Sequence, residues 1–156
     1  MNIHKKPEEH ARVVIDAQLT RAGWHVCDRK DIDLVNHRGN AVREVIMAKD
    51  HGRADYLLYV DKKVVGAIEA KPVGTPLAGV QWQSAMYAAG LPAAYRPQAI
   101  LKDDRLPFIF EASGSETQYT NGFDPTPRAR KIFNFPKPET LARIVRESDD
   151  HPAAPT

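Results

Sequence analysis

Two apolar segments separated by three charged residues restrict the fold of this 156-residue chain more than any other feature. The segments run from Asp55 to Val60 and from Val64 to Lys71, and Asp61-Lys62-Lys63 lies between them. Their length and their branched and aromatic residues predict two strands joined by a tight turn. Because both segments are apolar on both faces, we expect them in the middle of a sheet that is covered on each side. This pattern predicts an α/β layered domain and excludes an open meander.

The rest of the chain supplies the elements around this hairpin. One helix is expected from Pro7 to about Ala22, where Gly23 ends it, and another from about Ala78 to Ala89. The polar stretch with Asn36, Gly39 and Asn40 is expected to be a loop, and His51-Gly52 breaks the chain before the hairpin. Further short strands are expected at Trp24–Cys27, Ala41–Met47, Gln98–Leu101 and Phe108–Ala112.

The C-terminal part of the chain has a different composition. Half of the 12 prolines follow residue 124, so we expect a mostly irregular tail with a short helix near Pro138–Arg146. The folded domain is therefore predicted at residues 1–124, followed by a proline-rich, basic extension at 125–156. Whether the basic side chains there form a solvated face or bind phosphate stays open; they are Arg128, Arg130, Lys131, Lys137, Arg143 and Arg146.

Composition excludes several classes of protein. Hydrophobic residues make up 42% and charged residues 27% of the chain, which is typical of a globular domain, and the net charge of +2 predicts no global attraction to nucleic acid. The sequence contains no apolar run of the roughly 18 residues that a membrane span needs and no signal peptide, so we expect a cytoplasmic protein. The single cysteine, Cys27, excludes an internal disulfide and a cysteine zinc site, and is expected to be a buried structural thiol.

Two carboxylates are predicted to face each other in the hairpin. With a three-residue turn at 61–63, facing residues have numbers that add up to 124, which places Asp55 opposite Glu69. Such a pair is repulsive unless one group is protonated or a cation lies between them. Lys71 follows Glu69 by two positions and lies on the same face. A buried salt-bridge triad and a divalent cation bound by carboxylate oxygens are both compatible with this spacing.

Other polar residues are candidates for the same site. Gln83 and Tyr87 are four positions apart and share a helix face, although taken alone such residues are more often part of ordinary packing with satisfied hydrogen bonds. Glu8 lies on the inward stripe of the first helix. Glu44 either lies near the site or pairs with the neighbouring Arg43, and Arg53 either contacts phosphate or is a surface residue. The six histidines show no spacing such as H-E-x-x-H, which argues against a histidine-bound metal.

Three short segments together resemble a known family. These segments are Gly52-Arg53-Ala54-Asp55-Tyr56-Leu57-Leu58, Ile68-Glu69-Ala70-Lys71 and Gln83-Ser84-Ala85-Met86-Tyr87. They resemble the nuclease domain at the start of the DNA-translocating restriction subunit of type I restriction-modification enzymes, which has the PD-(D/E)xK fold. Asp55 matches the motif aspartate, with Ala54 in place of the usual proline, and the other two segments match the E-x-K and Q-x-x-x-Y elements. The segments Pro7–Trp24 and Glu116–Phe135 resemble the family's opening helix and the part that leads toward its motor.

The resemblance implies a restriction-endonuclease-like α/β fold with a mixed central sheet flanked by helices, and a metal-dependent DNA endonuclease at residues 1–124. Asp55, Glu69 and the carbonyl of Ala70 would bind Mg²⁺, with Mn²⁺ as a possible substitute, and Lys71 would orient or deprotonate a water molecule. Glu8 would complete the metal shell through water. The DNA-binding residues would be Gln83 and Tyr87.

The implied partners are double-stranded DNA and the modification and specificity subunits of a type I complex. ATP would act only through a motor domain, and the chain lacks the G-x-x-x-x-G-K-[ST] loop of such a motor, so it is expected to be a fragment or a detached domain. Two alternatives remain. One is a repair or recombination nuclease of the same fold, and the other is a non-catalytic DNA-binding or docking domain that keeps the triad as a salt bridge.

Overall fold

The protein is built around a seven-stranded mixed sheet, which a computed structural model describes for residues 7–47, 53–74, 77 and 91–150. The strands follow one another across the sheet in chain order. The pairs β1–β2 and β4–β5 are parallel and the other pairs are antiparallel. The α/β class and the mixed sheet are therefore confirmed. The strands are β1 (His25–Cys27), β2 (Gly39–Ile46), β3 (Arg53–Val60), β4 (Lys63–Ala70), β5 (Phe108–Ala112), β6 (Thr117–Asn121) and β7 (Arg130–Ile132).

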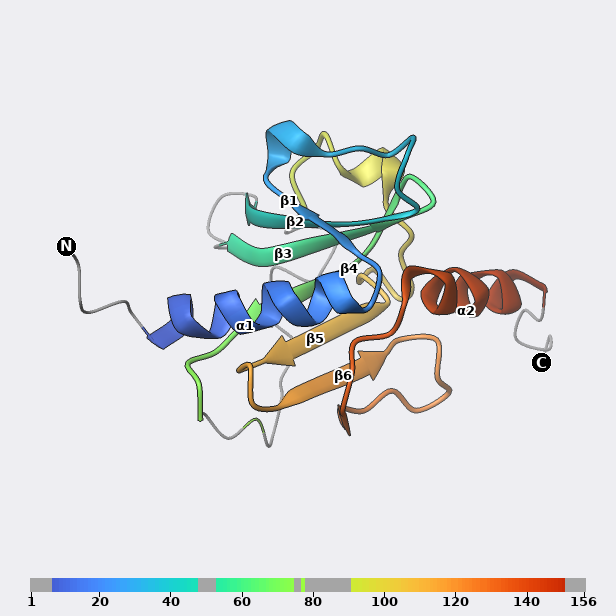
Figure 1. The fold of residues 1–156 in the computed structure, drawn as a ribbon. Helices are drawn as coiled ribbons and strands as arrows, with labels where there is room; N and C mark the ends of the chain where they lie inside the picture. Colours follow the sequence, from blue (N-terminus) through green and yellow to red (C-terminus); the bar gives the residue numbers. More distant parts are fainter. Residues whose placement is uncertain (1–6, 48–52, 75–76, 78–90, 151–156) are drawn as a thin grey trace.

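One face of the sheet packs against two helices, α1 (Pro7–Arg21) and α2 (Pro138–Asp150). Figure 1 shows α1 lying over the sheet, roughly along the direction of β3, and α2 on the right-hand side, beyond the C-terminal end of α1. Ile15 and Leu19 of α1 and Leu141 of α2 are fully buried in the same core cluster. Proline in the first turn begins α1, and Gly23, with a φ of +99°, lies just after it in the left-handed conformation that ends helices.

The other face of the sheet packs against the segment between residues 91 and 106. Leu91 and Leu106 are fully buried there, together with Leu57 of β3 and Ala67 of β4. The strand expected at Gln98–Leu101 is wrong. This part of the chain forms the 3₁₀ helix η4 (Arg96–Gln98) and a single bridge from Ala99 to Val64, so it covers the sheet and does not extend it.

The central hairpin has a tighter turn than the sequence indicated. Asp61 and Lys62 alone form the turn, both with positive φ of +50° and +70°, and β4 already begins at Lys63. Next to the turn the residue numbers of facing pairs add up to 123, but a shift between Leu58 and Tyr59 raises this value to 124 for the rest of the ladder. The predicted three-residue turn is wrong. The predicted register is confirmed for the pairs from Leu58–Gly66 to Tyr56–Ile68, and the regular ladder ends before the predicted pair Asp55–Glu69.

Several other boundaries differ from the predictions. β2 begins at Gly39, two residues early, because the buried Asn40 side chain donates to the carbonyls of Asp33 and His37, both at 3.1 Å, and accepts from the Asp33 amide. Within residues 125–150, which the structure describes, β7 and α2 together make up most of the chain, so this part is not mostly irregular. The helix predicted near Pro138–Arg146 is confirmed and continues to Asp150, and β6 was not predicted. A short 3₁₀ helix, η1 (Arg29–Asp31), lies before β2.

Cys27 is buried, as expected, and burial raises the pKa of its thiol. Among the residues that the structure describes, no helix is long and apolar enough to cross a membrane. The helix predicted at Ala78–Ala89 and the break at His51-Gly52 lie outside the described residues.

Candidate active site

The ladder between β2 and β3 is distorted at Asp55. Glu44 has a φ of +53°, and the regular pairing skips Glu44 and Asp55 although it continues on both sides of them. Ala54 lies in the same core cluster as Leu57, whereas residues three apart in a regular strand lie on opposite faces. The regular alternation of side chains between the two faces of the sheet is therefore interrupted at Asp55.

Donors on other elements contact both oxygens of the Asp55 carboxylate. Its Oδ2 accepts from the backbone N–H of Ala70 at 2.8 Å, and its Oδ1 lies 3.1 Å from Nη2 of Arg12 on α1. Arg12 also binds Glu44, which therefore pairs with Arg12 and not with its neighbour Arg43. The Ala70 contact ties the aspartate of β3 to the end of β4, where Glu69 and Lys71 stand on either side of Ala70.

Glu69 and Lys71 form the second half of the site. Lys71 Nζ lies 2.9 Å from Glu69 Oε1, which confirms that the two side chains share a face. The other oxygen, Oε2 of Glu69, is buried and has no hydrogen-bond partner among the described residues. The Lys71 backbone N–H donates to the carbonyl of Ala112 at 2.8 Å, so β5 fixes the end of β4. We call Asp55, Glu69, Lys71 and the Ala70 backbone the carboxylate site.

A third carboxylate lies beside this site and was missed by the sequence analysis. Glu111 of β5 is the parallel partner of Glu69 and is only 7% exposed. Burial raises its pKa, the negative charge of Glu69 raises it further, and Lys71 lowers it. The apolar stretch Phe108–Ala112 contains this one charged residue, which was the available signal. The sequence does not show that Glu111 lies beside Glu69, because that pairing depends on the parallel register of β4 and β5.

The donor atoms suit a hard divalent cation. Carboxylate and carbonyl oxygens are the ligands that Mg²⁺ prefers, and the unpartnered Oε2 of Glu69 offers one such atom. Within the described ranges, no three side chains of aspartate, glutamate, histidine or cysteine gather closely enough to hold a metal ion. A metal would therefore depend on Asp55, Glu69 and the carbonyl of Ala70, with water completing the shell.

Four of the other candidate site residues lie partly or wholly outside the part of the chain that the structure describes. The backbone of Glu8 lies in α1 and that of Arg53 in β3, but their side chains are not described. Gln83 and Tyr87 lie in the segment 78–90, outside the described residues. Of the charged residues that the sequence singled out, the structure thus brings together Asp55, Glu69 and Lys71, with Glu44 joined to Asp55 through Arg12.

Comparison with protein families identifies the domain. Residues 29–123, well over half of the chain, match the sequence model described as the type I restriction enzyme EcoKI endonuclease subunit second domain. The chain belongs to this family. The matched range contains the whole carboxylate site and Glu111, but ends before β7 and α2. No curated protein sequence matches the chain.

The fold of this family member resembles a solved structure. That structure is a fragment of an HsdR subunit assigned to a type I restriction enzyme from Vibrio vulnificus YJ016. The two chains are 20% identical, with a TM-score of 0.61, over 94% of this chain and 26% of the other. The likeness confirms the restriction-endonuclease-like α/β fold, and this chain spans about a quarter of the length of the Vibrio chain.

Proposed function

We propose that this type I endonuclease-subunit domain is a metal-dependent nuclease of the PD-(D/E)xK type that hydrolyses phosphodiester bonds in DNA. One observation carries the proposal: Asp55 of β3 binds the Ala70 amide at 2.8 Å, which joins the aspartate to the Glu69-Ala70-Lys71 segment. Aspartate, glutamate and lysine from two adjacent strands thus meet at one end of the hairpin, in a family whose description names an endonuclease subunit.

Each residue of the carboxylate site has a distinct role in this proposal. Asp55, Glu69 and the Ala70 carbonyl would hold Mg²⁺ or Mn²⁺. When bound, the metal would stabilise negative charge on the attacked phosphate and lower the pKa of a water molecule. Lys71 would orient that water or take its proton, because its ammonium group lies directly beside a metal-binding carboxylate.

Arg12 supports Asp55 from outside the site. Its guanidinium group and the Ala70 N–H occupy different oxygens of the Asp55 carboxylate, so the side chain has one defined orientation. Arg12 is therefore proposed as a positioning residue, and Gln83 and Tyr87 remain the proposed DNA contacts.

The larger assembly is also part of the proposal. Double-stranded DNA would be the substrate, modification and specificity subunits would be the partners, and ATP would act only through a motor domain elsewhere in the complex. Two ion pairs favour the alternative that the domain is non-catalytic. Lys71 pairs with Glu69 and Arg12 pairs with Asp55, so both carboxylates are already neutralised. The experiment must separate a metal site from a structural salt bridge.

Titration with Mn²⁺ by calorimetry provides this test. Asp55→Asn and Glu69→Gln should each abolish metal binding, because each removes a charged ligand from a site with few others. Lys71→Ala should preserve metal binding and abolish DNA cleavage by the assembled complex. The matched control is Glu116→Gln, because Glu116 forms an ion pair of the same 2.9 Å length with Lys131 and is not one of the residues of the carboxylate site. This variant should bind metal and cut DNA like the wild type.

Two results would contradict the proposal. Undiminished metal binding in both carboxylate variants would show that the metal binds outside the carboxylate site. Cleavage at the wild-type rate by Lys71→Ala, with a lower melting temperature, would make the triad a structural salt bridge.

A further inference from the structure

Glu111 is a buried carboxylate that lacks a partner in the described part of the chain. It is only 7% exposed, and it forms no hydrogen bond or ion pair with a described residue. Its neighbours across the sheet are Glu69 of β4 and Gln118 of β6, and neither side chain carries a positive charge. Burying a carboxylate is costly unless a counter-charge or hydrogen-bond donors reach it. The arrangement therefore favours a ligand that carries positive charge.

Lys71 supplies one positive charge for two carboxylates. Its Nζ lies 2.9 Å from Oε1 of Glu69, and its charge also acts on Glu111. Glu69 and Glu111 are partners in a parallel ladder, so their side chains lie on the same face of strands that are about 4.8 Å apart. When both are ionised they repel each other, and Oε2 of Glu69 has no hydrogen-bond partner among the described residues. A divalent cation beside Glu69 would remove this imbalance.

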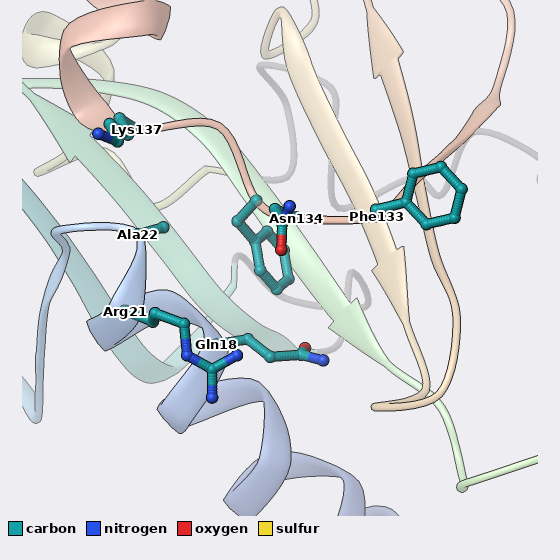
Figure 2. Close-up of a pocket in the computed structure, with 7 residues that line it drawn as sticks. Gln18, Arg21, Ala22, Phe133, Asn134 and Lys137 are labelled. Atoms are coloured by element: carbon teal, nitrogen blue, oxygen red, sulfur yellow. The ribbon is translucent and has the colours of Figure 1, made fainter.

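A pocket of about 300 Å³ between α1 and the connection from β7 to α2 offers no comparable site for a cation. Figure 2 shows Arg21 of α1 and Lys137, which precedes α2, among the side chains that line it. None of the described residues that line this pocket is acidic. The unbalanced negative charge lies instead at Glu69 and Glu111, on the adjacent strands β4 and β5.

We infer that Glu111 is a positioning residue for the divalent cation of the proposed nuclease and accepts hydrogen bonds from water molecules that the cation keeps. The inference rests on the proposed function, which places that cation at Asp55, Glu69 and the carbonyl of Ala70. Glu111 is assigned a role through water because no three acidic side chains in the described ranges gather closely enough to hold one ion directly. Mg²⁺ gives up its water reluctantly and usually keeps several molecules, whose O–H groups are donors that a charged acceptor on the next strand can orient.

Calorimetric titration of the 156-residue chain with Mn²⁺, in the absence of DNA, tests this inference. Glu111→Gln should weaken Mn²⁺ binding by roughly 10- to 100-fold and leave the number of bound ions unchanged, the loss typical of a residue that orients the ligands of a metal. The matched control is Glu116→Gln, which also removes one negative charge, from a glutamate that pairs with Lys131. This control should bind Mn²⁺ with the affinity of the wild type.

Thermal melts in EDTA and in Mn²⁺ separate this role from a structural one. In EDTA, Glu111→Gln should melt above the wild type, because its repulsion with Glu69 is removed. The same concentration of Mn²⁺ should raise the melting temperature of the variant less than that of the wild type, because the variant binds the ion more weakly. A changed melt in EDTA with wild-type Mn²⁺ affinity would make Glu111 a structural residue and overturn the inference. Complete loss of Mn²⁺ binding would also overturn it, since Glu111 would then be a direct ligand.

The titration also distinguishes failure of this inference from failure of the proposed function. If Asp55→Asn abolishes Mn²⁺ binding but Glu111→Gln binds with wild-type affinity, only the role of Glu111 is wrong. If Lys71→Ala cuts DNA at the wild-type rate, the nuclease proposal is contradicted and a weaker affinity of Glu111→Gln still supports the role of Glu111 at the metal. Absence of Mn²⁺ binding in the wild type would overturn both.

Discussion

At the scale of single residues, three carboxylates and two cations determine the electrostatics of the carboxylate site. Arg12 and Lys71 neutralise Asp55 and Glu69 directly. Glu111 is different, because it is buried beside Glu69 and burial raises the pKa of its carboxyl group. The folded protein therefore binds a proton at Glu111 more tightly than the unfolded chain does, which makes the stability of the domain sensitive to pH.

The substitution Glu111→Gln tests this effect in the metal-free protein. The contribution of protonated Glu111 is fully present below the pKa of an unfolded glutamate and is lost as the pH rises through the higher folded-state pKa. Glutamine imitates the protonated form, so the variant should melt above the wild type at neutral pH. The difference should disappear near pH 3.5 in thermal melts recorded with EDTA.

Glu116→Gln is the control for this comparison, and its expected change in melting temperature has the opposite sign. The ion pair with Lys131 lowers the pKa of Glu116, so its contribution is present above the unfolded pKa and is lost as the pH falls through the folded-state value. This variant should therefore melt slightly below the wild type at neutral pH. A lower melting temperature for Glu111→Gln would show that ionised Glu111 stabilises the fold.

At the scale of elements, the β3–β4 hairpin combines a two-residue turn with a shift in register. Lys62 has a φ of +70° and Asp61 a φ of +50°, the combination that a tight hairpin turn requires and that glycine adopts without cost. Asp61 is held in place by Arg38, whose Nε lies 2.8 Å from Oδ1 and whose carbonyl accepts the Asp61 N–H. Both residues are in the left-handed region, and these contacts of Asp61 make Lys62 the position at which glycine can be tested without loss of an ion pair.

Lys62→Gly should stabilise the hairpin. A non-glycine residue in the left-handed region costs about 1–2 kcal/mol, so relief of that cost should raise the melting temperature by a few degrees. Lys63→Gly is the neighbouring control; it places glycine at the first position of β4, where it should lower the melting temperature. If Lys62→Gly melts below the wild type, the Lys62 side chain contributes more than its backbone costs.

At the scale of the whole molecule, one core joins the N-terminal and C-terminal parts of the chain. Phe135 and Leu141 are buried in the same cluster as α1 and the central strands, and Trp24 Nε1 donates to the carbonyl of Pro136 at 2.9 Å. β7 pairs with β6 from Thr117 to Tyr119. The predicted boundary at residue 124 stays a prediction, and this packing argues that residues beyond it contribute to stability.

Truncation tests that boundary. A chain of residues 1–124 would lose Phe135 and Leu141 from the core, so it should show no cooperative thermal transition by circular dichroism. Leu141→Ala in the full chain should lower the free energy of unfolding by about 2–5 kcal/mol, the usual effect of removing a buried leucine side chain. Exposed Arg146→Ala is the control and should change the stability little. A truncated chain that melts like the full chain would support a domain that ends at residue 124.

The sequence alone was sufficient for the features that depend on local patterns. The apolar runs of β3 and β4 indicated central strands, and Pro7 and Gly23 marked the ends of α1. The two-position spacing of Glu69 and Lys71 placed both side chains on one face. Strand alternation and helix termini depend on residues that are close together in the chain, so they can be predicted from the sequence.

Tertiary structure decided the features that depend on residues far apart in the chain. The change of face at Asp55 requires a distortion in two strands at once, and the pairing of Glu69 with Glu111 requires the parallel register of β4 and β5. Arg12 reaches Glu44 and Asp55 only because α1 packs over the sheet. Such contacts arise from the packing of whole elements, since a local pattern contains no information about which distant segment will lie beside it.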